Sequence, residues 1–224
     1  MLTLVIDTAT PSVTAGVFDV NDDTVTTRGE YTVVDARGHG ERLAPMIDAS
    51  LKDASAAPAD LAAIVVGLGP GPFTGLRVGL VTAASMADAL GIPAYGVCSL
   101  DALGLAVSQS VEAPGRILVA TDARRKEVYW GLYDEEGRRL RGPEVEKPEQ
   151  LPPDIAEATH LAGDGALQYP QIFPDPLEEP RFPPAPAFAE LAADRIRAGA
   201  PTEPLTPLYL RRPDVHVNGK RQRI

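Results

Sequence analysis

Apolar and polar positions alternate along the first third of the chain in the manner of β-strands and then change to a helical period. Three strands are predicted at the start, in "LTLVIDT", "VTAGVFDV" and "VTTRGEYTVV", separated by turn residues. From His39 the apolar positions fall on one face of a helix, with Leu43, Met46, Ile47, Ser50, Leu51 and Ala54 in line. The pattern then predicts a strand in "LAAIVVGLG", a second helix from an N-cap at Thr74 to about Leu90, and a strand in "IPAYGVCSL".

The second helix carries a stripe of small residues and almost no polar face. Between residues 75 and 90 only Arg77 and Asp88 are charged, which predicts a helix buried on more than one side. Gly79 costs a helix interior about 1 kcal/mol relative to alanine, so another group is expected to approach it closely. Burial under the chain's own second half and contact with a partner protein are both open, and the short second half favours the partner. The stripe comprises Gly71, Gly75, Gly79, Ala83, Ala87 and Gly91.

The two halves of the chain resemble each other. "LVIDTATPSVTAGVFD", which ends at Asp19, can be set beside "LVATDARRKEVYWGLYD", which ends at Asp134. With one residue of slack, the matched pairs are Asp7 with Asp122, Gly16 with Gly131, and Phe18 with Tyr133. "THLAGDGA" echoes "AIVVGLGPG" as a strand that enters a glycine turn, whereas proline-rich text leaves less room for helix in the second copy.

This duplication predicts an α/β protein with the two-lobed fold of actin-like (ribonuclease H-like) proteins, built on mixed sheets and with a reduced second lobe. The first lobe is expected to span residues 1–100 and the second lobe, with a final helix, residues 101–200. A tail is expected over residues 201–224.

Composition and charge narrow the function. The 224 residues are 44% hydrophobic, enough for a substantial core, and the N-terminus has no basic leader or membrane-length apolar run, so a cytoplasmic protein with no membrane association is expected. The formal net charge of −10 argues against binding nucleic acid unaided, so any RNA would be met through a partner. Residues 211–224 hold five basic residues and one acid, which suits a solvated tail or a docking tail. The single Cys98 is expected to be a buried small hydrophobe, and the three histidines lack zinc-ligand spacing.

The glycine-rich loop before the second helix fails the strict phosphate-binding signatures, because Leu76 stands where a Walker motif has lysine. A glycine turn at a helix N-terminus still suits an anion, and Arg77 would either support it or pair with a carboxylate. An independent actin-like ATPase or sugar kinase is therefore the alternative function. Its vestigial phosphate loop would comprise Asp7, Thr8, Thr10, Gly69, Gly71, Thr74, Gly75 and Arg77.

Seven segments, in order, resemble the TsaB (YeaZ) family, whose members are the non-catalytic partners in making the threonylcarbamoyl modification of tRNA. They are "LVIDTAT", "HGERLAPMID", "GLGPGPFTGLRVGL", "GVCSLDALG", "DARRKEVYWGLY", "GDGA" and "PLYLRR", and they cover nearly the whole chain. The resemblance implies that the first two helices pack against a TsaD-type transferase subunit or a second copy, that a TsaE-type ATPase joins, and that tRNA is met only through the complex. The partner interface carried over from the family comprises Leu43, Met46, Ile47, Leu51, Leu76, Gly79, Leu80, Ala83 and Ala87.

The resemblance also implies no catalytic residue, no metal ligand and no cofactor of the chain's own, although a nucleotide or an adenylate at the junction with the partner is compatible with it. The catalytic paralogue binds metal through an HxxxH pair, whereas His39 is followed by "GERL" and is expected to be a helix-start or structural residue. Arg124, Arg125 and Lys126 replace the glycines of a second phosphate loop and are expected to form an exposed basic turn. A peptidase is the weakest alternative.

Overall fold

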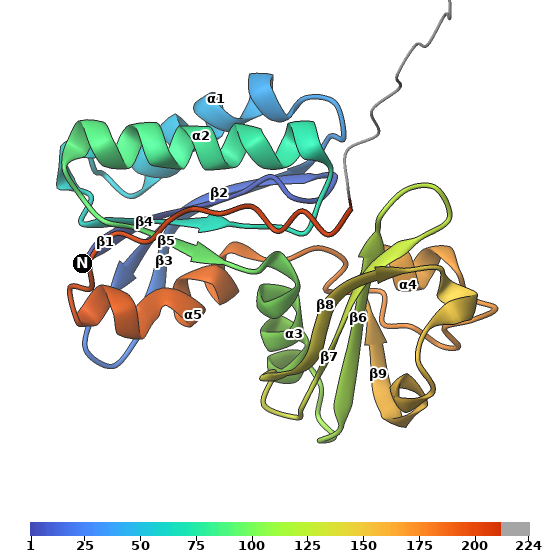
Figure 1. Cartoon of the computed structure of the whole chain (residues 1–224). Helices are drawn as coiled ribbons and strands as arrows, with labels where there is room; N and C mark the ends of the chain where they lie inside the picture. The colour runs from blue at the N-terminus through green and yellow to red at the C-terminus, as the bar shows by residue number, and fades with distance from the viewer. Residues whose placement is uncertain (212–224) are drawn as a thin grey trace, which may run out of the picture.

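Two mixed β-sheets form the centres of two lobes in the computed structural model, which describes residues 1–211 (Figure 1). The first sheet has the strand order β3-β2-β1-β4-β5, in which β1 pairs antiparallel with β2 and parallel with β4. Its strands are β1 (Leu2–Asp7), β2 (Ser12–Val20), β3 (Val25–Val34), β4 (Ala63–Gly67) and β5 (Ala94–Val97). A 3₁₀ turn, η1 (Pro58–Asp60), precedes β4.

Helices cover both faces of the first sheet. On one face lie α1 (His39–Asp53) and α2 (Phe73–Leu90), and on the other lies α5 (Ala185–Arg197) (Figure 1). The side chains of β1 divide between the two faces, because Leu4 and Ile6 pack beneath α1 and α2 while Val5 packs toward α5. The strands β1 and β4 are apolar on both faces because both faces are covered, whereas the edge strand β3 is largely exposed and polar.

The second sheet repeats the plan with fewer elements, in the order β8-β7-β6-β9. Its strands are β6 (Arg116–Asp122), β7 (Val128–Tyr133), β8 (Arg139–Glu146) and β9 (Ala158–Ala162), with the turns η2 (Pro148–Gln150) and η3 (Pro153–Glu157) before β9. On its two faces lie α3 (Ser99–Ser110), which connects the lobes, and the short α4 (Asp164–Gln168). The predicted reduction of the second lobe is confirmed.

The predicted duplication is also visible in the packing of the two hairpins. A Cβ added at Gly16 would lie 2.8 Å from the ring of Phe18, and one added at Gly131 would lie 2.8 Å from the hydroxyl of Tyr133. Both aromatic side chains are fully buried. In each half, therefore, a glycine leaves room for an aromatic ring two residues later.

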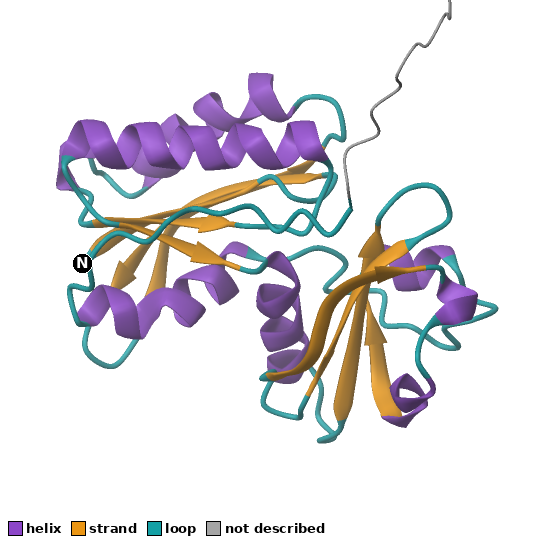
Figure 2. Ribbon diagram, viewed as in Figure 1, coloured by secondary structure: helices purple, strands orange, loops and turns teal. Residues whose placement is uncertain are grey.

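The last part of the chain differs from the prediction. The helix α5 was assigned to the second lobe, but it packs against the first sheet. Residues 201–211, assigned to a tail, run as an extended strap along the first lobe (Figure 2). The amide of Glu203 donates to the carbonyl oxygen of Ala94 (3.1 Å), and the amide of Leu208 donates to that of Leu68 (2.8 Å). The rest of the basic tail, residues 212–224, lies outside the described residues.

The predicted helix and strand positions hold with small shifts. The helix α2 begins at Phe73 with Pro72 as its N-cap and no side-chain cap, so the N-cap role predicted for Thr74 is wrong. The fixed φ of proline and its lack of an N–H suit the start of a helix. No helix in the described part of the chain has both the length and the hydrophobicity of a membrane span.

Candidate functional site at the cleft between the lobes

The turn after β1 is tied into the backbone of α2. The hydroxyl of Thr8 donates to the carbonyl oxygen of Gly75 (2.8 Å) and accepts from the amide of Gly79 (3.0 Å). A Cβ added at Gly79 would lie 2.6 Å from this hydroxyl oxygen, and one added at Gly71 would lie 2.0 Å from the carbonyl oxygen of Ala9. Gly71 and Gly79 of the stripe thus pack against the chain's own first lobe, whereas Gly91 at its end is exposed. The question of the second half or a partner concerns the opposite side of α2.

Asp7, at the end of β1, is enclosed rather than presented to a ligand. Its side chain is buried, and its Oδ1 accepts from the hydroxyl of Ser99 (2.9 Å). A Cβ added at Gly67 would lie 1.8 Å from the same oxygen, so only glycine fits there. Burial raises the pKa of Asp7 to about 7, although the hydrogen bonds from Ser99 and from the backbone of Ala9 act in the opposite direction.

The other residues of the predicted phosphate loop divide between core and surface. Thr10 is buried, and its carbonyl oxygen lies 2.8 Å from Nε2 of His39, which is the first residue of α1, as predicted. Thr74 and Arg77 are exposed. The guanidinium of Arg77 lies over the ring of Phe73 and donates to the hydroxyl of Tyr209 (3.0 Å). The eight residues of the predicted loop therefore do not form one open cradle.

The structure corrects the residues chosen for the partner interface. The side chains and glycines in that set are buried within the single chain, between the helices and the first sheet, so they are not available to a partner. The helical period was read correctly, but the apolar stripe it identified is the core face. The residues that the structure places in the core instead of at an interface are Leu43, Met46, Ile47, Leu51, Leu76, Gly79, Leu80, Ala83 and Ala87.

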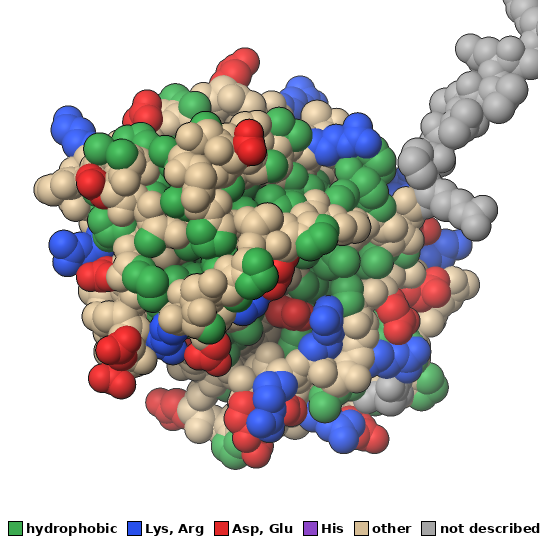
Figure 3. All heavy atoms as spheres, turned by 60° about the vertical axis from the view of Figure 1, so that its left-hand side comes forward, with side chains coloured by type: hydrophobic (Ala, Val, Ile, Leu, Met, Phe, Trp, Pro, Cys, Tyr) green, Lys and Arg blue, Asp and Glu red, His purple; other side chains and the backbone are tan. Residues whose placement is uncertain are grey.

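The outward face of α2 is unusual in a different way. Val81 is 63% exposed, with Ala84 and Ser85 also exposed and Val78 half-buried beside them. No charged residue lies on this helix between Arg77 and Asp88. In Figure 3 hydrophobic side chains are scattered over the upper part of the molecule, where α1 and α2 lie. This outward face of α2 is apolar and exposed, whereas the exposed face of α1 carries charged residues such as Glu41, Arg42 and Asp48.

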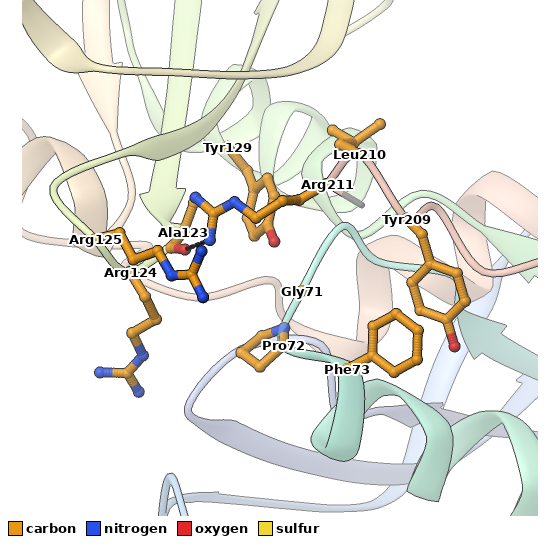
Figure 4. A pocket seen from close by; sticks show the side chains of 10 residues that line it. All are labelled: Gly71, Pro72, Phe73, Ala123, Arg124, Arg125, Tyr129, Tyr209, Leu210 and Arg211. Atoms are coloured by element: carbon orange, nitrogen blue, oxygen red, sulfur yellow. Dashed lines mark hydrogen bonds between the residues drawn. The ribbon is translucent and has the colours of Figure 1, made fainter. Parts of the chain in front are cut away.

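A hollow of about 350 Å³ lies between the lobes (Figure 4). It is lined from the first lobe by the start of α2, from the second lobe by the turn between β6 and β7, and by the end of the strap. The full lining is Gly71, Pro72, Phe73, Ala123, Arg124, Arg125, Tyr129, Tyr209, Leu210 and Arg211.

The strap closes one side of this hollow through two contacts. The ring of Tyr209 stacks on that of Phe73, with centroids 4.1 Å apart and planes 12° apart. Arg211 donates to the carbonyl oxygen of Ala123 (3.1 Å) and forms an ion pair with Glu127. The strap therefore connects the first lobe to the second. Sequence reasoning missed this role, although "PLYLRR" had stood out as a motif.

The second lobe places two carboxyl groups near the cleft. Oδ1 of Asp164 accepts from the amide of Asp122 (3.1 Å). Burial raises the pKa of Asp164 to about 6, and the neighbouring charge of Asp122 adds to the increase. Within residues 1–211, no three His, Cys, Asp or Glu side chains come together as a set that could hold a metal ion.

Cys98 behaves as the sequence suggested. Its side chain is buried, and burial raises the pKa of the thiol to about 12. A thiol with such a pKa is protonated at neutral pH and is a poor nucleophile. It therefore serves as a core residue.

Comparison with known proteins gives a consistent picture. Residues 30–190 match the family model described as TsaD, tRNA N6-adenosine threonylcarbamoyltransferase. An uncharacterized protein of Mycobacterium tuberculosis is 50% identical over 211 residues, covering 94% of this chain and 92% of the relative. The tRNA threonylcarbamoyladenosine biosynthesis protein TsaB of Bacillus subtilis is 38% identical over 133 residues, 59% of this chain and 55% of its own length.

Solved structures agree over a longer span. YeaZ from Pseudomonas aeruginosa superimposes with a TM-score of 0.77 at 29% identity, covering 93% of this chain and 99% of that one. A second structure from the same organism, described as similar to peptidase YEAZ, gives a TM-score of 0.78 at 30% identity, with 94% and 99% covered. Both lobes are included in these matches.

Proposed function

Since the chain belongs to the TsaB (YeaZ) family, we propose that it is a non-catalytic subunit of the bacterial machinery that makes threonylcarbamoyladenosine at position 37 of tRNA. In this proposal it binds a TsaD-type transferase and stabilises it in an active form. The relatives' names support the pathway, since the Bacillus subtilis protein is a tRNA threonylcarbamoyladenosine biosynthesis protein. Self-association, recruitment of a TsaE-type ATPase and a nucleotide or adenylate at the junction belong to the same proposal.

The outward face of α2 is the observation that carries the scaffold role. An exposed valine flanked by small residues, with no charge over three helical turns, is unusual on a chain with 23% charged residues. Such a surface loses little by desolvation, and small residues allow a second helix to approach closely. Contact with a partner would bury this face without disturbing the core-facing side of α2.

The enclosed residues around Asp7 argue for a non-catalytic subunit and against the ATPase or sugar-kinase alternative. An actin-like kinase needs its first-turn acid and hydroxyl groups directed at a phosphate. Here the hydroxyl of Thr8 is committed to the backbone of α2, and Asp7 is held against Ser99 and Gly67. Binding a phosphate at these residues would require the turn to separate from α2.

Light scattering on the chain alone and on its mixture with the cognate TsaD-type subunit tests the proposal, followed by a tRNA modification assay on each sample. The expected result is a mixed complex that modifies tRNA, with the chain alone inactive in both modification and ATP turnover. ATP turnover or tRNA modification by the chain alone would replace the scaffold role with an enzymatic one. Full activity of the transferase without this chain would also contradict the proposal.

A further inference from the structure

Two adjoining hollows at the cleft form a continuous basic groove. The hollow of about 350 Å³ shares Pro72 and Arg124 with a second one of about 290 Å³, which runs toward the start of α1. Four arginines line the pair, and neither hollow has an aspartate or glutamate in its lining. We call this surface the arginine groove, defined by Arg37, Arg124, Arg125, Arg211, Phe73 and Tyr129.

The chain's overall charge makes this grouping notable. Acidic residues outnumber Lys and Arg by 31 to 21, and the formal net charge is −10. The neighbouring hollow that shares Arg124 is lined by Asp122, Asp164, Glu178 and Glu179, so the single sign of charge is confined to the two hollows of the groove. Within them the nearby arginines, more than the net charge of the chain, determine the local potential. The argument that a net charge of −10 prevents nucleic-acid binding therefore does not apply to this surface.

The turn that supplies two of the arginines has an unfavourable backbone. Arg124, Arg125 and Lys126 have φ values of 63°, 57° and 63°, a left-handed region that residues with side chains rarely occupy. Two backbone hydrogen bonds hold the turn in place. The amide of Ala123 donates to the carbonyl oxygen of Glu127 (3.0 Å), and the amide of Glu127 donates to the carbonyl oxygen of Arg124 (3.0 Å). The result is a short turn of three consecutive cations, two of which, Arg124 and Arg125, line the groove.

Two of the guanidinium groups lie beside each other. In Figure 4 the side chains of Arg125 and Arg211 run together at one wall of the hollow, on the side of Tyr129. Burial lowers the pKa of Arg211, and the positive charge of Arg125 lowers it further. Two carboxylates offset part of this positive charge. Glu127 forms an ion pair with Arg211, and Oδ2 of Asp122 lies 3.5 Å from Nη1 of Arg124.

The groove also has aromatic walls, formed by Tyr129 and by the stacked rings of Phe73 and Tyr209. The cations of a groove are the part of a single-stranded nucleic-acid site that follows the phosphates. The rings here shape the walls rather than serve as stacking platforms, because Tyr129 is only 7% exposed and Phe73 and Tyr209 cover one face of each other. We propose that the arginine groove binds the sugar–phosphate backbone of an unpaired RNA segment. The cations come from three separate parts of the chain, which suits successive phosphates better than one phosphate group. That this RNA is the tRNA substrate rests on the proposed function.

The experiment measures binding of a fluorescently labelled anticodon stem–loop RNA by anisotropy over a series of salt concentrations. It compares the wild-type complex with the TsaD-type subunit and two double variants, Arg37→Ala with Arg124→Ala, and Arg28→Ala with Arg138→Ala. Arg28 and Arg138 are exposed and lie outside the groove, so this control removes the same charge. Light scattering first establishes the mass of each complex. If even the wild-type complex fails to assemble, the proposed function fails, and the RNA measurement is made on the chain alone.

The groove variant is expected to bind RNA about tenfold more weakly, with the slope of log affinity against log salt shallower by about 1.4 for two lost phosphate contacts. The control variant is expected to match wild type. Equal affinity and slope in wild type and groove variant would overturn the proposal, as would equal losses in both variants. AMP binding is measured on the same variants. If the groove variant loses AMP binding while its RNA affinity is unchanged, the groove is a nucleotide site instead. If the groove variant assembles less well with the TsaD-type subunit, the groove is a protein contact.

Discussion

The backbone amide of Gly79 donates to the hydroxyl of Thr8 at 3.0 Å, which places a side chain of the first β-turn inside the hydrogen-bond ladder of α2. The same hydroxyl donates to the carbonyl oxygen of Gly75 at 2.8 Å, so it bridges two groups that a regular helix would join directly. The absence of a side chain at Gly79 makes this approach possible, because a Cβ there would lie 2.6 Å from the hydroxyl oxygen.

Gly79→Ala is therefore expected to destabilise the chain by about 1–3 kcal/mol through overpacking, despite the better helix propensity of alanine. Gly40 in α1 provides the matched control, since a Cβ added there meets nothing within 4 Å. Gly40→Ala is expected to be neutral or stabilising by up to about 1 kcal/mol. Urea denaturation of both variants measures the difference, and equal effects at the two sites would contradict the packing described at Thr8.

Val81→Arg is expected to weaken association with the TsaD-type subunit at least tenfold while leaving the stability of the chain within about 0.5 kcal/mol of wild type. Val81 is 63% exposed on the outward face of α2, so arginine is solvated in the free chain and is buried only by a partner. Leu140→Arg is the control, because Leu140 is 52% exposed on β8, in the other lobe. Light scattering and titration with the TsaD-type subunit measure the affinity of both variants. Equal affinities would show that the outward face of α2 is not the interface.

Asp7 predicts a specific pH dependence of stability. Its folded-state pKa of about 7 lies above the ordinary value of 3.8, so the folded state holds a proton that the unfolded state has released between these pH values. The free energy of unfolding contributed by this group is therefore full below pH 4 and is lost as the pH rises through 7.

The variant Asp7→Asn removes the pH-dependent part of the free energy of unfolding that comes from Asp7. From pH 5 to pH 8, wild type is expected to lose about 2–3 kcal/mol relative to the variant, whatever their stability difference at pH 5. Urea denaturation of both proteins at the two pH values measures the change. A stability difference that stays constant with pH would show that Asp7 is ionised in the folded protein at pH 5.

Tyr209→Ala is expected to release the strap with a small loss of global stability, about 0.5–1.5 kcal/mol for the lost stack on Phe73. Hydrogen exchange should report the change at the amide of Leu208, which donates to the carbonyl oxygen of Leu68. Tyr209→Phe keeps the stacked ring and removes only the hydrogen bond from Arg77, so its exchange should stay close to wild type. Unchanged protection of Leu208 in the alanine variant would mean that the stack does not hold the strap.

Much of the fold could be predicted from the sequence because it depends on local signals. The strands around Val5 and Val65 are continuous apolar runs. The matched pairs Gly16 with Gly131 and Phe18 with Tyr133 carry the duplication in residue type and spacing. The period of α1 and α2 located their apolar stripes correctly. The interface residues carried over from the family resemblance lie on these stripes, and a helical period does not say what covers a stripe, so residues of the core were expected at a partner interface.

The cleft was less accessible to prediction because its parts are distant in sequence. Phe73 and Tyr209 meet across more than a hundred residues, and the strap has no periodicity that would indicate its path. The basic turn at Arg124 was identified from its composition, but its role as a wall of the cleft depends on how the lobes are placed. The predicted phosphate loop failed at Asp7 because enclosure by Gly67 and Ser99 is a property of the assembled core.

The position of α5 has a consequence for how the chain is made. The lower face of the first sheet, with Val5, Phe18 and Tyr95, is covered by residues of Ala185–Arg197, and the edge at Ala94 is completed by Thr202 and Glu203. The second lobe is therefore an insertion within the first. During vectorial synthesis the first lobe leaves the ribosome with one layer missing, and it obtains that layer only when residues 185–203 have followed the second lobe out. The two lobes are thus made as one unit, and a chain released before Ala185–Arg197 would expose this apolar face to chaperones and proteases.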